Sequence, residues 1–320
     1  MKKYKISHVA TGSVLKEDCE GSYSVRPSIE RFSDRILCSD AVDALRTIPD
    51  NSIQAIITSP PYFQQRDYGT GEIQIGGEQK PEDYISRLVA VFGEARRILR
   101  PDGLLWLNLG DKFQNGLLLG MPWRVALALQ SSGWMLRSDI IWHKPNAMPH
   151  SAKTRPTVDH EYVFMMSKSS EYYYDADAIR EPHVTFSEHS KMKGGRNHFG
   201  KRGGTPENGK NGGNSNLHNG RWDQAFHPLG RNKRTVWNIP LSKYRGAHFA
   251  VFPETLVENC MKASSKSGDY VLDPFAGSGT VAAVAARLQR KFVMIEVSQQ
   301  YCELIQERLN STQMELVPQQ

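Results

Sequence analysis

Residues 270–280 read YVLDPFAGSGT, an apolar run followed by an acidic residue and a glycine-containing loop. Residues 270–272 predict a buried strand, and the apolar residues that follow Thr280 predict a helix. A loop between a strand and a helix is where a doubly wound sheet binds a nucleotide-like ligand. Gly277 and Gly279 let the backbone approach such a ligand closely. The stretch therefore predicts an α/β fold with a cofactor site, although a structural glycine turn would have the same sequence.

The loop differs from two phosphate-binding patterns. It lacks the lysine of a P-loop and the third glycine of a dinucleotide fingerprint. A nucleoside without phosphates therefore fits better. The predicted cofactor-binding residues of the loop are Asp273, Pro274, Phe275, Gly277, Gly279 and Thr280.

Two further carboxylates stand at the ends of expected strands. Glu296 ends the strand expected at 292–295, from where a carboxylate can accept hydrogen bonds from both ribose hydroxyls of a nucleoside. A solvent-facing glutamate is the alternative at this position. Asp40 ends the first expected strand, at 35–38, and its carboxylate could accept a bond from an adenine amino group. Both are predicted cofactor-binding residues.

A proline-rich segment, TSPPY at 58–62, follows another expected buried strand, at 52–58. Open α/β sheets place active sites at this end of their strands, and the two prolines fix the direction of the Pro60 carbonyl. An aromatic amine becomes nucleophilic when acceptors such as the Ser59 oxygen and this carbonyl pull its nitrogen toward tetrahedral geometry. If the amine belongs to a nucleic-acid base flipped out of its helix, Tyr62 can stack on that base. A proline-stiffened turn is the alternative interpretation. The predicted catalytic residues are Ser59, Pro60, Pro61 and Tyr62.

Strands and helices alternate along the remaining chain, which implies a largely parallel sheet covered on both faces. The expected elements are a helix from Pro81 that stops at 100–103, a strand at 104–109, a helix at 121–130 with Gly133 as its stop, paired strands at 140–143 and 162–166, and a last helix ending near Leu309.

The chain has 320 residues, a formal net charge of +6 and a pI of about 9.0. Its basic excess is concentrated at 191–234, a run rich in Gly, Lys, Arg, Asn and His without apolar periodicity. This run predicts either a solvated, disordered loop or a loop that orders when it contacts DNA. The candidate DNA-binding residues are Lys191, Lys193, Arg196, Lys201, Arg202, Arg231, Lys233 and Arg234.

The cysteine spacing and the apolar segments argue against a metal protein and against a membrane protein. The cysteines are scattered, without the spacing of zinc ligands or of a disulfide framework, so we expect no metal. No segment has the apolar length of a signal peptide or a membrane span, so we expect a cytoplasmic protein with no membrane partner.

Segments 58–62 and 273–280 resemble the catalytic and cofactor motifs of S-adenosylmethionine-dependent DNA amino-methyltransferases, in the class whose catalytic motif comes first. The resemblance covers 31–309 except the glycine-rich insert. It extends to four further segments, 65–69, 104–111, 141–146 and 248–253. The last of these is similar to the segment that packs beside the methionine part of the cofactor, which makes Pro253 a cofactor-binding candidate.

The resemblance implies a Rossmann-like, doubly wound mixed sheet of a class I methyltransferase, circularly permuted, with an inserted target-recognition region. It also implies double-stranded DNA as a partner and, as a further possibility, a restriction endonuclease acting on the same site. The expected regions are an N-terminal arm at 1–30, the catalytic half at 31–168, the target-recognition insert at 169–246, the cofactor-binding half at 247–312 and a tail at 313–320.

The resemblance further implies methyl transfer from S-adenosylmethionine to the exocyclic amino group of a flipped base. Cytosine N4 is favoured over adenine N6 because position 59 is Ser, where adenine enzymes of this family more often have Asp or Asn. RNA or protein amide methyltransferases carry a related signature, but their glycine loop usually precedes it. A catalytically silent DNA-binding regulator is a further alternative, but it would give no function to either the 58–62 segment or the 273–280 loop.

Overall fold

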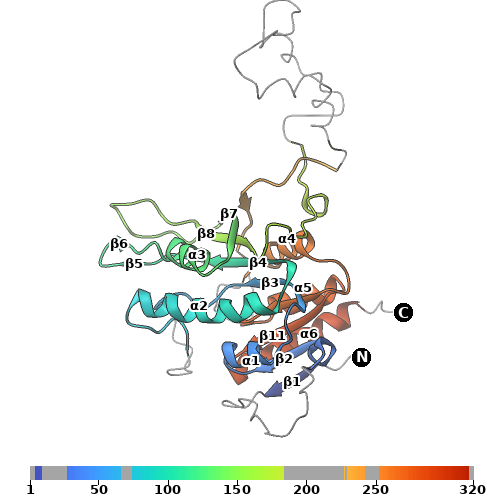
Figure 1. Cartoon of the computed structure of the whole chain (residues 1–320). Coiled ribbons are helices and arrows are strands. Elements are labelled where there is room, and N and C mark those ends of the chain that lie inside the picture. The colour runs from blue at the N-terminus through green and yellow to red at the C-terminus, as the bar shows by residue number, and fades with distance from the viewer. Residues whose placement is uncertain are drawn as a thin grey trace, which may run out of the picture. The chain divides into compact units, whose positions relative to one another are not determined.

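The computed structural model describes residues 4–8, 27–65, 74–183, 227, 229–241 and 252–316 (Figure 1). The chain divides into two compact units, Met1–Asp175 with Thr235–Gln320, and Ala176–Arg234. The larger unit contains a nine-stranded sheet with the strand order β1-β2-β11-β10-β3-β4-β8-β7-β9. Its strands are β1 (Lys5–His8), β2 (Arg35–Cys38), β3 (Ile53–Thr58), β4 (Leu99–Leu109), β7 (Met135–His143), β8 (His160–Ser167), β9 (Val236–Asn238), β10 (Tyr270–Asp273) and β11 (Lys291–Glu296).

Most neighbouring strands of this sheet are parallel. The exceptions lie at β8, which runs antiparallel to both β4 and β7, while β9 is parallel to β7. The predicted mixed α/β sheet is therefore confirmed. A separate hairpin pairs β5 (Phe113–Gln114) with β6 (Leu117–Leu118).

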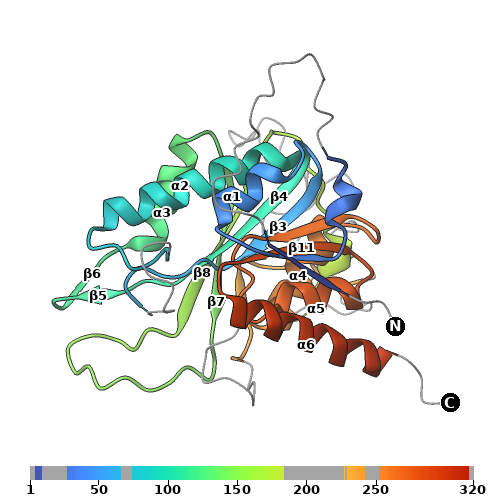
Figure 2. The same ribbon diagram turned by 90° about the horizontal axis from the view of Figure 1, so that it is seen from below.

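Two groups of helices lie on opposite sides of the sheet in the larger unit (Figure 2). The helices α1 (Ala41–Thr47), α2 (Pro81–Ile98) and α3 (Met121–Ser131) pack in sequence on one side, after a short 3-10 helix at Ile29–Phe32. The helices α4 (Glu254–Ser264), α5 (Thr280–Arg287) and α6 (Gln299–Leu316) pack in the same way on the other side. Apolar residues of the central strands, such as Ile56, Leu105 and Leu272, are therefore fully buried.

The junction of α2 and β4 differs from the prediction. Residues 100–103 were expected to form a stop between helix and strand, but α2 ends at Ile98 and β4 begins at Leu99. The pairing with β3 passes from Ile53↔Leu99 to Ala55↔Leu104, so the extra residues form an irregularity within the strand. A bulge of this kind accommodates Pro101 and Gly103, which a regular central strand would not. A Cβ at Gly103 would also lie 2.8 Å from the Gln54 carbonyl oxygen.

The smaller unit has little regular structure among its described residues. A 3-10 helix spans Asp177–Ile179, and Glu181 forms an antiparallel bridge with Arg231. None of the helices within the described ranges has the length and apolar character to cross a membrane.

Candidate active site

A cavity of about 240 Å³ opens where β3 and β10 end. These strands are parallel neighbours in the sheet, with Leu272 opposite Ile56, so their carboxyl ends meet at one edge. The segments that follow them, 59–62 and 274–278, both line the cavity although they lie far apart in the sequence. The two predicted motifs therefore form one site.

A buried hydrogen bond joins the two motifs. Thr58 Oγ1 donates to Asp273 Oδ1 at 2.6 Å, and the Phe275 amide donates to the same oxygen at 3.0 Å. Asp273 is 4% exposed, and this burial raises the pKa of its carboxyl group to about 7, with a further contribution from Glu296. Asp273 Oδ2 accepts no bond from the described residues and is available to a ligand.

Glu296, at the end of β11, is anchored by the glycine loop. The Gly277 amide donates to Glu296 Oε2 at 2.9 Å, and the Ser298 amide donates to Oε1 at 3.0 Å. Burial raises the pKa of the Glu296 carboxyl group, although these backbone bonds oppose the shift. Gly277 adopts a left-handed conformation with φ of +50°, which brings its amide to the carboxylate.

The turn after β2 adds two polar side chains to the same cavity. Asp40 caps α1, since its Oδ1 accepts from the amides of Val42 at 2.8 Å and Asp43 at 3.2 Å. Its Oδ2 has no partner within the described ranges. Ser39 is 7% exposed, and its Oγ is buried without a partner among the described residues. A buried unpaired hydroxyl is unfavourable unless a ligand or water satisfies it.

The cavity brings together most of the predicted cofactor-binding residues. Gly279 and Pro253 are not among the lining residues. Gly279 has φ of +76°, and a Cβ there would lie 2.8 Å from Ile305 Cγ2, so α6 packs closely against this glycine. Pro253 is the N-cap of α4, and its neighbour Phe252 lines the cavity instead. Residues 242–251, which include most of the expected segment 248–253, lie outside the described residues. The predicted residues that do line the cavity are Asp40, Asp273, Pro274, Phe275, Gly277, Thr280 and Glu296.

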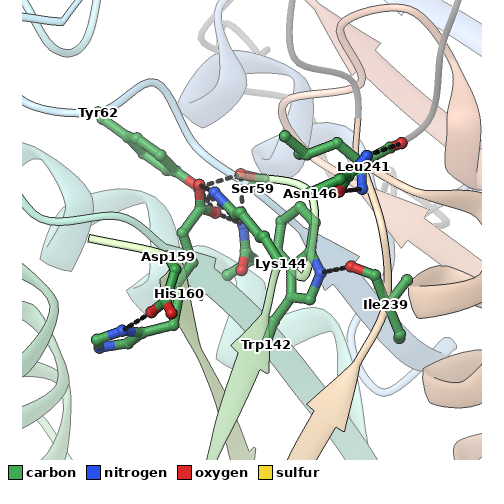
Figure 3. A network of polar contacts seen from close by, with 11 residues as sticks. Ser59, Tyr62, Trp142, Lys144, Asn146, Asp159, His160, Ile239 and Leu241 are labelled. Carbon is green, nitrogen blue, oxygen red and sulfur yellow. Dashed lines mark hydrogen bonds and ion pairs between the residues drawn. The ribbon is translucent and has the colours of Figure 1, made fainter. Parts of the chain in front are cut away.

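Two of the predicted catalytic residues, Ser59 and Tyr62, lie in a cluster of polar contacts, in which their side chains and that of Lys144 point toward one another (Figure 3). Ser59 Oγ donates to the Tyr62 hydroxyl at 3.2 Å, and that hydroxyl donates to Glu161 Oε2 at 2.6 Å. Asn108 Nδ2 donates to the Tyr62 hydroxyl and to Glu161 Oε2, each at 2.7 Å. Lys144 Nζ forms an ion pair with Glu161 Oε1. Pro60 and Pro61 also line the cavity.

Tyr62 is partly exposed toward the cavity, but its hydroxyl is surrounded by this cluster. Burial raises the pKa of the Tyr62 hydroxyl well above its usual value, and the nearby Glu161 carboxylate raises it further. The phenol therefore keeps its proton over the whole physiological range and acts as a hydrogen-bond donor to Glu161.

Sequence reasoning assigned no site role to Glu161, Asn108 or Lys144. Asn108 lies in β4 and Glu161 in β8, two strands that pair antiparallel, whereas Lys144 directly follows β7. Asn108 is the single polar residue in the apolar run 104–109, and this signal could have identified it, because a strand buried in a sheet carries few polar residues without a structural or functional partner. Glu161 lies beside His160 at the polar start of β8, where no such signal is present.

The candidate DNA-binding residues are mostly outside the described part. Lys191, Lys193, Arg196, Lys201 and Arg202 fall there. Arg231, Lys233 and Arg234 are described within the smaller unit, where Arg231 Nε lies 3.1 Å from Glu181 Oε1. Their predicted role remains a prediction.

The fold and the cavity define an α/β protein with a ligand site at the carboxyl edge of a mostly parallel sheet. A family model for DNA methylases of the N6/N4 type matches residues 53–307. The type II methyltransferase M.Cfr9I of Citrobacter freundii is 40% identical over 299 residues, which cover 84% of this chain and 85% of that protein. M.SmaI of Serratia marcescens is 38% identical over 304 residues, covering 86% and 90%. The chain belongs to this family of DNA methylases.

Solved structures have the same fold. The PvuII DNA methyltransferase, which is cytosine-N4-specific, matches with a TM-score of 0.60 at 18% identity and covers 88% of this chain and 91% of that one. TTHA0409 of Thermus thermophilus, complexed with S-adenosyl-L-methionine, matches with a TM-score of 0.57 at 25% identity and covers 89% and 95%.

Proposed function

We propose that this protein is a type II DNA methyltransferase that methylates the exocyclic N4 of cytosine in double-stranded DNA, with S-adenosylmethionine as methyl donor. The observation that carries the proposal is the single cavity lined by both the Ser59–Tyr62 segment and the Asp273–Thr280 loop. An enzyme of this type needs a cofactor site and a target-base site that open onto one another, because the methyl group moves directly between them.

The cofactor half of the cavity fits a cationic nucleoside. Asp273 Oδ2 is a free acceptor for a cationic group, Glu296 suits the ribose hydroxyls, and Asp40 suits the adenine amino group. The unpartnered Ser39 Oγ, close to Asp40, offers one more hydrogen bond to a ligand in this half. When bound, S-adenosylmethionine supplies an electrophilic methyl group on its sulfonium.

The other half of the cavity fits an aromatic amine. Ser59 and Pro60 line the cavity, and in this proposal the Ser59 Oγ and the Pro60 carbonyl accept hydrogens of the amino group, which makes its nitrogen nucleophilic. Tyr62 offers a ring face for stacking on a flipped base, as enzymes that modify bases require. The methylated amine then loses a proton readily, so no strong base and no covalent enzyme intermediate are needed.

Cytosine is proposed as the target because position 59 is a serine. The adenine enzymes that this sequence resembles more often have Asp or Asn at this position, so a serine favours cytosine. The cytosine-N4-specific PvuII enzyme has the same fold, which supports this choice.

We also infer the wider setting of the reaction. The names of M.Cfr9I and M.SmaI favour a modification role beside a restriction endonuclease that acts on the same site. The strand order, in which β10 lies between β11 and β3, supports a circularly permuted methyltransferase core. The basic run at 191–234 is our candidate for DNA recognition within the 169–246 insert, and the site of action is the cytoplasm.

The nucleosides of methylated DNA test this proposal. Unmethylated DNA is incubated with the purified protein and S-adenosylmethionine, then digested and separated by mass. N4-methyldeoxycytidine is the expected product. N6-methyldeoxyadenosine without methylated cytidine would overturn the choice of base, and the absence of any methylated nucleoside would overturn the enzymatic activity.

A further inference from the structure

The hydrogen bonds around Tyr62 all run toward one acceptor. The Ser59 hydroxyl donates to the Tyr62 hydroxyl, which donates to Glu161 Oε2. Asn108 Nδ2 donates to the same carboxylate oxygen at 2.7 Å. A carboxylate accepts and never donates, so Glu161 fixes the direction of each bond in the chain.

This direction determines what Ser59 offers to a ligand. Because the Tyr62 hydrogen is used by Glu161, the Tyr62 oxygen is left as an acceptor and takes the Ser59 hydrogen. Among the described residues, Ser59 Oγ accepts only a long contact of 3.3 Å from Asn108 Nδ2, so a lone pair remains available on the cavity side. Ser59 is therefore an acceptor toward the cavity, which is what a primary amino group requires.

We propose that Glu161, paired with Lys144, is a positioning residue that orients the Ser59 hydroxyl as an acceptor for the amino group of the target base. This inference rests on the proposed function, because it assigns a role in that reaction to a residue outside the predicted motifs. Glu161 acts through Tyr62 and Ser59.

The surroundings of Glu161 suit a fixed acceptor. Glu161 lies opposite Trp142 in the β7–β8 pair, and Lys144 Nζ lies 4.6 Å from the Trp142 ring centroid. The side chains of Glu161 and Lys144 are each 15% exposed, so water competes little for the carboxylate. The Trp142 indole donates to the Ile239 carbonyl at 2.8 Å, which holds the ring beneath Lys144 in place (Figure 3).

A second feature holds the Tyr62 ring independently of Glu161. A Cβ at Gly110 would lie 2.6 Å from Tyr62 Cε2, so the ring occupies the space that any other residue at 110 would fill. The Tyr62 ring is thus packed against the backbone after β4, and its hydroxyl reaches Glu161 from that position. Removing the Glu161 charge changes the direction of the hydrogen bonds without removing the ring from its place.

The test compares Glu161→Gln, Tyr62→Phe and the double variant. Glutamine can donate to the Tyr62 oxygen, which allows Tyr62 to donate to Ser59 and turns the serine hydrogen toward the cavity. Phenylalanine at position 62 keeps the ring but removes the hydroxyl, so it interrupts the series of hydrogen bonds between Ser59 and Glu161. Glu258→Gln is the matched control, because Glu258 also pairs with a lysine, Lys262, at 2.6 Å but does not line the cavity.

Three quantities are measured for each variant: the single-turnover rate of tritiated methyl transfer to unmethylated DNA, the Kd for S-adenosylmethionine by calorimetry, and the Tm. We expect Glu161→Gln and Tyr62→Phe each to slow transfer by about ten- to a hundredfold, the range for one charge-assisted hydrogen bond in a transition state. The Kd should stay within twofold of wild type, and Glu258→Gln should keep the wild-type rate. The double variant should be no slower than the slower single variant, because both changes interrupt the same series of hydrogen bonds.

Other results would overturn the inference. A Glu161→Gln rate within twofold of wild type would do so, as would a double variant whose effect is the product of the two single effects. A Glu161→Gln variant that is slow only because it misfolds would show a lowered Tm and weakened cofactor binding. In that case Tyr62→Phe becomes the test, and a Tyr62→Phe rate within twofold of wild type would overturn the inference. A wild-type protein that transfers no methyl group to DNA would instead overturn the proposed function, and this inference with it.

Discussion

Asp273→Asn should make the cofactor-free protein more stable while weakening cofactor binding. The side chain is 4% exposed, and its burial raises the pKa of the carboxyl group to about 7. An asparagine oxygen can replace Oδ1 and accept the same two bonds, from Thr58 Oγ1 and the Phe275 amide. The substitution therefore removes a buried titrating group and keeps its hydrogen bonds.

The size of the effect depends on pH. A carboxyl group whose pKa is raised on folding binds more protons in the folded state, so its contribution to stability is fully present below the unfolded pKa and is lost as pH rises through the folded pKa. A rise from 3.8 to about 7 corresponds to about 4 kcal/mol. The variant and the wild type should thus differ little near pH 4, and their difference should grow up to about pH 7 and then level off.

Thermal unfolding of both proteins between pH 5 and pH 9 measures this difference. We expect the Tm of the variant to exceed that of wild type by roughly 5–10 °C at pH 9, and by clearly less at pH 5. Calorimetry should show at least tenfold weaker binding of S-adenosylmethionine by the variant at pH 8, because the free carboxylate oxygen is lost. A Tm difference that does not change with pH, or a variant less stable at pH 9, would refute the reasoning about the buried carboxyl.

Three further results are expected. The affinity of wild type for S-adenosylmethionine should rise between pH 6 and pH 8, because a cationic ligand favours the ionised form of Asp273; calorimetry that finds a flat profile would argue against a contact with Asp273. Gly110→Ala should slow methyl transfer more than tenfold without changing the cofactor Kd, since its Cβ would displace the Tyr62 ring; an unchanged rate would show that the ring position is not critical. Deleting residues 191–234 should abolish DNA binding and spare cofactor binding, and an unchanged DNA affinity and salt dependence would return this segment to a solvated loop.

The sequence predicted the elements whose patterns are local. The strand at 35–38 coincides with β2, and Gly133, with φ of +101°, follows the end of α3 as its C-terminal stop. The predicted start of β4, at residue 104, was wrong because residues 100–103 contain Pro and Gly, which indicate a loop. Their place in a strand depends on the pairing of β4 with β3, and a local pattern does not contain that pairing.

The candidate site was predicted only in part for the same reason. Ser59 and Asp273 follow apolar strands in recognisable motifs, so both could be placed at strand ends from the sequence. Glu161 belongs to the cluster because β8 runs antiparallel beside β4, which brings its carboxylate to Tyr62. The sequence near Glu161 contains no signal for that pairing, and no spacing connects it to Asn108.

The central claim is that segment 58–62 acts on the target base while the glycine loop holds the cofactor. Its most direct test is Ser59→Ala, with methyl transfer to DNA and the Kd for S-adenosylmethionine measured on the same preparation. The predicted result is a transfer rate reduced by about 10²–10³-fold, as for a lost transition-state hydrogen bond, with a Kd within a few-fold of wild type. Near-normal transfer, or a loss of cofactor binding equal to the loss of rate, would contradict the account.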